Sequence, residues 1–150
     1  MNEMTIAQMV GFGINGSVLA ALSIRDIKEK SIHLIPLGIL GIFNTLFGLF
    51  LGYTAGQTLG GMIPGAFGVA VSLCTKGKLG LGDGLVLMVT GIFLGWEKVL
   101  AGWLIALILT SLTGIVLIIM KKACLKTALP FVPFIFAGLT LAEIAEKVVP

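Results

Sequence analysis

The chain has 150 residues, of which 57% are hydrophobic and 11% are charged. Roughly a quarter of a soluble domain is charged, so this composition argues against a water-soluble protein. A helix that crosses a bilayer needs about 20 mostly apolar residues, which leaves room for about six helices joined by short loops. We therefore expect an all-α fold: a polytopic membrane helix bundle in which residues 1–150 form a single integral membrane domain.

Splitting the apolar stretches at charges and turn residues predicts six helices. No Lys or Arg precedes the first stretch, so we interpret it as a retained helix and not as a signal peptide. The fourth is short, about 27 Å at 1.5 Å per residue, and its start is expected to lie within the membrane. The predicted ranges are Thr5–Ile24, Ile32–Tyr53, Gly56–Cys74, Leu79–Trp96, Val99–Met120 and Ala128–Ile144.

The basic residues predict the orientation, because cytoplasmic loops carry an excess of Lys and Arg. Only Lys98 and Lys147 fall on the opposite side from the others, and both termini are then expected outside the cytoplasm. This topology accounts for the net charge of +3, so no nucleic-acid partner is expected. The loops after the first, third and fifth helices contain Arg25, Lys28, Lys30, Lys76, Lys78, Lys121, Lys122 and Lys126.

Small and polar residues within the apolar stretches predict contacts between helices. Glycines four residues apart allow two helix backbones to approach closely, and such pairs are Gly61 with Gly65 and Gly91 with Gly95. Polar residues within the spans are expected to form hydrogen bonds between helices: Asn15, Asn44, Thr110, Ser111 and Thr113. Cys74 and Cys124 are expected to be free thiols, and His33 to mark a helix boundary.

Two aspartates are the main candidates for chemistry. Asp26 follows the first predicted helix, Asp83 begins the fourth, and both fall on the cytoplasmic side. Two adjacent carboxyl groups cannot both ionise readily, so one can act as a base and the other as an acid on a water molecule. Gly80, Gly82 and Gly84 would let a substrate backbone approach. Alternatively, Asp26 is an ordinary loop residue and Asp83 caps a helix.

Three segments of the chain resemble the type IV prepilin peptidases, a family of GxGD membrane aspartyl proteases. Asp26 precedes the basic residues Lys28 and Lys30, and Gly80-Leu81-Gly82-Asp83 matches the GxGD motif. Residues 129–134, Leu-Pro-Phe-Val-Pro-Phe, are similar to a Pro-Phe-x-Pro-Phe segment of that family. The chain differs where the family often has Ile-Pro-Asn, here residues 32–34, Ile-His-Leu, and where it commonly has a lysine, here Leu85.

The resemblance implies a short, peptidase-only enzyme that cleaves the basic leader of type IV prepilins or pseudopilins at the cytoplasmic face of the cell membrane. Asp26 and Asp83 would be catalytic, without a metal or other cofactor. Glu29 could attract the leader, and the remaining motif residues expected near the substrate are Gly80, Gly82, Gly84, Pro130 and Pro133. The expected partners are the substrate and the lipid bilayer, and the oligomeric state stays open.

Two other functions remain possible from the sequence. Intramembrane carboxylates also bind cations or relay protons, so the chain could be a small ion-coupled or proton-coupled transport component. It could also be an inactive relative of the peptidases that takes part in the assembly of a pilus or secretion machine, because Leu85 and residues 32–34 depart from the family pattern.

Overall fold

The computed structural model describes residues 3–29, 34–75, 80–121 and 129–148, and these ranges contain six α-helices and no strand. The predicted all-α class is confirmed. Some predictions concern residues outside the described ranges: Lys30, His33, Lys76, Lys78, Lys122, Cys124 and Lys126. The helices are α1 (Glu3–Glu29), α2 (Leu34–Phe50), α3 (Ala55–Cys74), α4 (Leu81–Leu94), α5 (Trp96–Ile119) and α6 (Val132–Val148).

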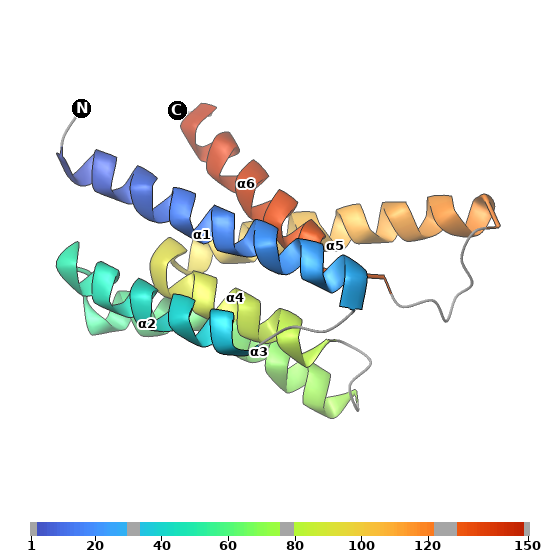
Figure 1. Cartoon of the computed structure of the whole chain (residues 1–150), viewed down its shortest axis with the longest axis horizontal. Helices are drawn as coiled ribbons and strands as arrows, with labels where there is room; N and C mark the ends of the chain where they lie inside the picture. The colour runs from blue at the N-terminus through green and yellow to red at the C-terminus, as the bar shows by residue number, and fades with distance from the viewer. Residues whose placement is uncertain (1–2, 30–33, 76–79, 122–128, 149–150) are drawn as a thin grey trace.

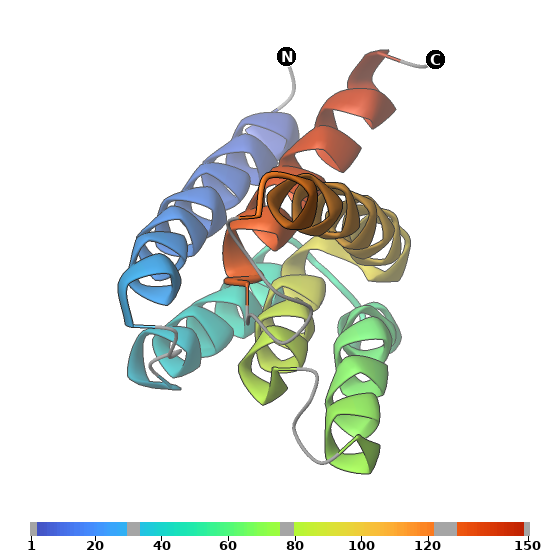
Figure 2. The same cartoon turned by 90° about the vertical axis from the view of Figure 1, so that its right-hand side faces the viewer.

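Successive helices run in opposite directions along the bundle, and both chain termini lie at the same end (Figure 1). Seen from the other end, α4 lies between α2 and α3, with α5 and α6 above them and α1 to one side (Figure 2). The most extensive contacts join α3 to α4 and α5 to α6. Arg25 and Lys28 at the end of α1 and Lys121 after α5 are thus separated from Lys98 by the length of the bundle.

The outer surface of the bundle is apolar, as a bilayer requires. The helices α1, α3 and α5 are each long and apolar enough to cross a membrane, and α2 and α4 are shorter apolar helices. Along α5, Ile108, Leu112 and Ile119 are more than half exposed, which is a favourable arrangement only against lipid. The short α4 agrees with the short fourth helix that the sequence predicts.

A buried pair of amides joins three helices in the interior. The side chains of Asn15 in α1 and Asn44 in α2 donate to each other, with both N–O distances at 2.9 Å. Asn44 also donates to the carbonyl of Val89 in α4. The expected hydrogen bonds between helices are therefore confirmed for these two residues. The expectation was wrong for Thr110, Ser111 and Thr113, whose hydroxyls donate to carbonyls four residues earlier in α5, a common bond within helices.

Glycines bring α3 and α4 into backbone contact. A Cβ on Gly61 would collide with the carbonyl oxygen of Gly91, and one on Gly65 with the backbone of Met88. The close packing predicted at Gly61, Gly65 and Gly91 is thus confirmed. Gly95 has a different role from the predicted one: with φ of 82° it ends α4 and precedes α5, a conformation that glycine adopts readily.

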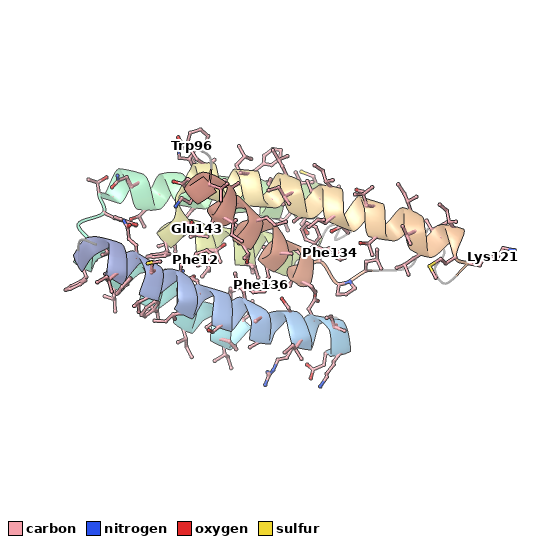
Figure 3. The ribbon with its side chains drawn as sticks, turned by 90° about the horizontal axis from the view of Figure 1, so that it is seen from above. Phe12, Trp96, Lys121, Phe134, Phe136 and Glu143 are labelled. Atoms are coloured by element: carbon pink, nitrogen blue, oxygen red, sulfur yellow. The ribbon has the colours of Figure 1, made fainter. Side chains whose placement is uncertain are left out.

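A second glycine contact joins α5 to α6. A Cβ on Gly138 would meet the carbonyl oxygen of Gly102, and one on Gly102 would meet Leu139. At the end of the bundle that holds the termini, the Lys98 ammonium of α5 lies 3.0 Å from Glu143 and 2.9 Å from Glu146, both in α6. Figure 3 shows Glu143 near Phe12 of α1, and both residues line a small pocket of about 80 Å³.

Several helix boundaries differ from the predicted ones. The first helix continues to Glu29 instead of ending at Ile24, because Arg25, Asp26 and Lys28 do not interrupt an existing helix. The second ends at Phe50, where the Tyr53 amide donates to the Gly48 carbonyl across Gly52 with φ of 79°. The sixth begins at Val132 and not at Ala128.

The neighbouring glycines at positions 60 and 61 provide a test of the α3–α4 contact. We expect Gly61→Ala to destabilise the protein by about 1–3 kcal/mol, because its Cβ overpacks the contact with α4. Gly60 has open space around it, so Gly60→Ala should be neutral or stabilising by up to about 1 kcal/mol through helix propensity. Thermal unfolding in detergent micelles measures both; equal melting temperatures for the two variants would contradict the contact.

Candidate active site

Asp26 lies inside α1, one turn before the end of the helix, and its side chain faces the interior. It is 7% exposed, which rules out the ordinary loop residue that the sequence left as an alternative. Its Oδ2 atom accepts a hydrogen bond of 3.1 Å from the backbone N–H of Val132, 106 residues later. A carboxylate buried in an apolar bundle requires such a partner.

The partner of Asp26 is the first residue of α6. The Phe134 and Ile135 amides both donate to the carbonyl of Phe131, so the helix begins directly after that residue. Pro133 lies in the first turn, where a missing N–H costs nothing and the fixed φ suits a helix. The first N–H groups of a helix have no acceptor within it and favour an anion. The Pro-Phe-Val-Pro-Phe segment therefore presents a helix N-terminus to Asp26.

Asp83 lies in the first turn of α4, where Gly80 is the N-cap residue. Because α4 begins at Leu81, Asp83 is the third residue of the helix, and Gly80 occupies the N-cap position that the sequence had left open for Asp83. A Cβ on Gly80 would collide with Oδ2 of Asp83. The first glycine of the motif thus leaves room for the Asp83 carboxyl group itself.

The third glycine of the motif region packs against α3. A Cβ on Gly84 would lie 2.6 Å from the amide nitrogen of Val69, and one on Gly68 would lie 3.4 Å from the Cα of Gly84. The start of α4 is therefore held close to α3, and Asp83 with it. Gly82 is half-buried in the same turn. Internal packing accounts for Gly80 and Gly84, which the sequence assigned to substrate approach.

Asp26 in α1 and Asp83 in α4 lie on helices that contact each other. The two residues are 57 positions apart in the chain, and both lie at the end of the bundle away from the termini. Two neighbouring carboxyl groups resist simultaneous ionisation and share a proton. Such a pair can take a proton from a water molecule and give one to the product of its attack.

The other predicted residues lie at the end of α1 and at the start of α6. Glu29 is the last residue of α1 and is exposed, one turn beyond Asp26. Pro130 is half-buried just before α6, and Pro133 is half-buried in its first turn. Within the described residues, no group of three or more His, Cys, Asp or Glu side chains could hold a metal ion. Cys74 is an exposed free thiol, as expected.

An apolar pocket of about 360 Å³ opens between α1 and α2. It reaches Leu22, one turn before Asp26, and Arg25, the residue next to it. The far wall comes from Pro36 in the first turn of α2. The residues that line it are Ser17, Val18, Ala21, Leu22, Arg25 and Pro36. This pocket offers an apolar surface beside the buried carboxylate.

Residues 13–119 match the type IV leader peptidase family. The chain belongs to this family. The matched range contains both aspartates and the GxGD motif. It ends before α6, so Val132 and the prolines on either side of it lie outside the match. No curated protein and no solved structure matches the chain.

The contact of the Val132 amide with Asp26 was not predicted from the sequence. The prolines of residues 129–134 had predicted a motif near the substrate. A signal was present, because a proline in the first turn marks the start of a helix, and the free amides there are a site for an anion. What the sequence lacked was the position of this turn next to Asp26.

The first glycine of the GxGD motif allows a test of the space around Asp83. We expect Gly80→Ala to lower the turnover of a leader-bearing substrate by about 10- to 100-fold, because the new methyl group displaces the carboxyl group. Gly38→Ala in α2 is the control, since a Cβ there meets nothing within 4 Å. Melting temperatures should be similar, and full activity of Gly80→Ala would show that Asp83 does not need this space.

Proposed function

We propose that the protein is a membrane aspartyl endopeptidase that removes the basic leader of type IV prepilins or prepilin-like proteins. The observation that supports this most strongly is that Asp26 and Asp83, from two separate helices, lie at one end of the bundle, within a range that matches leader peptidases. One carboxyl is held by a helix N-terminus and the other lies in the glycine motif. The basic residues around this end support a cytoplasmic position for the site.

In the proposed reaction Asp26 is the carboxylate and Asp83 is the acid. Asp26 takes a proton from water as the water oxygen attacks the scissile carbonyl carbon, and Asp83 gives its proton to the carbonyl oxygen. The resulting diol then collapses: the C–N bond breaks, the amine nitrogen receives the proton from Asp26, and Asp83 recovers a proton from a diol hydroxyl. The helix N-terminus beside Asp26 supports this assignment, because the N–H of Val132 donates a hydrogen bond to the Asp26 carboxylate.

The proposed substrate has an apolar helix after the cleaved bond, and the pocket between α1 and α2 is suited to its first turns. The lining is apolar apart from Ser17 and Arg25, and the small residues Ser17 and Ala21 allow another helix to come close. The pocket runs along α1 to Leu22 and Arg25, so in this proposal a segment lying in it would end near Asp26. The basic leader would then lie beyond α1, near Glu29.

Replacement of either aspartate by asparagine tests the proposed chemistry. We expect Asp26→Asn and Asp83→Asn each to lower leader cleavage by about 10²- to 10⁴-fold, because the amide keeps the shape but cannot exchange a proton in the same way. Cleavage of a co-expressed prepilin is measured by the change in its mobility, at equal membrane abundance of each variant.

The control is Glu97→Gln, the same chemical change at an exposed position in the first turn of α5 at the opposite end of the bundle. It should cleave like the wild type. If both aspartate variants cut normally, the catalytic assignment is wrong. If the wild type cuts no prepilin-like leader, transport or an inactive assembly role becomes the better interpretation.

A bulky residue in the α1–α2 pocket tests the proposed position of the substrate. We expect Ala21→Phe to raise KM by about tenfold and to leave kcat near the wild-type value, because it fills a surface that only binds the substrate. Ile24→Phe is the control, at an exposed position of α1 that does not line the pocket. An unchanged KM for Ala21→Phe would place the apolar segment elsewhere.

A further inference from the structure

We propose that the backbone N–H of Val132 is a positioning group for catalysis, which fixes the Asp26 carboxylate so that one oxygen is bound by α6 and the other is presented to the attacking water. This inference rests on the proposed aspartyl protease function. It assigns to α6 an effect on the reaction that acts through Asp26, although α6 lies outside the range that matches the leader peptidases.

The geometry of the hydrogen bond supports this role. The N–H of Val132 donates to Oδ2 of Asp26 at 3.1 Å, and Val132 is completely buried. Water therefore does not compete for this N–H, and a hydrogen bond to a charged group is stronger than one between neutral groups. Because Pro133 has no N–H, Val132 supplies the only backbone donor of the first two residues of α6.

The start of α6 is held in place by contacts on two sides. Val132, Ile135 and Leu139 belong to the core cluster that also contains Leu19 and Leu22 of α1. Figure 3 shows Phe136 between α6 and α1, and a Cβ on Gly16 would lie 3.7 Å from its ring. On the other side, Gly138 packs on Gly102 of α5. The donor is therefore part of a rigid element.

The described helices that contact α1 carry few charged residues. Among the helices that contact α1, the described part of α2 contains no charged residue. In α4 the charged residue is Asp83, and in α6 the charged residues Glu143, Glu146 and Lys147 lie in the last turns, at the opposite end. Arg25, Lys28 and Glu29 of α1 itself are exposed. In the part of the chain that the structure describes, the Val132 N–H donates to the Asp26 carboxylate.

The test removes the N–H and keeps the helix. Proline is tolerated in the first position of a helix, so Val132→Pro deletes the donor while the backbone keeps its course. Val132→Ala is the matched control: it loses side-chain volume but retains the N–H. Both variants are purified in detergent without truncation. The kcat and KM values are then measured for cleavage of a prepilin that the wild type cuts.

We expect kcat of Val132→Pro to be about 10- to 100-fold below that of Val132→Ala, with KM within about twofold, because the lost bond orients the base and does not bind the substrate. A loss that appears only in KM, or equal kcat values for the two variants, would overturn the proposal. If the wild type and Val132→Ala cut but Asp26→Asn cuts equally well, the proposed function itself fails, independently of Val132.

A second variant covers the case in which Val132→Pro does not fold. Incorporation of the hydroxy acid analogue of valine at position 132 replaces the N–H by an ester oxygen and leaves the side chain unchanged. This variant should show the same fall in kcat, with a melting temperature close to that of the wild type. Wild-type kcat in the ester variant would overturn the proposal.

Discussion

The contact between α3 and α4 is the constraint on which the rest of the structure depends. Without a hydrophobic driving force between helices in lipid, close packing has to supply the attraction, and it requires residues without side chains. Gly61 against Gly91 and Gly68 against Gly84 provide it. Because α4 has only 14 residues, this contact determines where Asp83 lies. The other helices are arranged around α4 (Figure 2).

The two aspartates are held by different physical means. Asp83 lies in the first turn of a helix that is fixed by glycine contacts, and Gly80 leaves space for its carboxyl group. Asp26 lies on α1, which makes fewer contacts with α4 than α3 does. A hydrogen bond from α6 fixes the orientation of the Asp26 carboxylate. Three helices therefore contribute to a site with two acidic side chains. A peptidase that acts within an apolar bundle needs this support, because water cannot compensate for a misplaced charge.

The polar contacts along the bundle divide into structural and chemical groups. Asn15 and Asn44 bond to each other and to α4, so their polar atoms are used in holding α1, α2 and α4 together. Lys98 joins α5 to Glu143 and Glu146 of α6 at the end that holds the termini. The aspartates differ from these groups, because placing two carboxyl groups near each other in a bundle costs free energy. Such a cost is typical of a functional site.

The sequence by itself determined the class of fold, because the length and apolarity of its segments allow few structures other than membrane helices. It also determined the two aspartates as candidates, since charges at membrane depth are rare. The tertiary structure decided the rest. Hydropathy does not show that α1 continues past Ile24, that Gly95 separates two helices, or that Val132 meets Asp26. These depend on contacts between residues up to 106 positions apart, which no local pattern encodes.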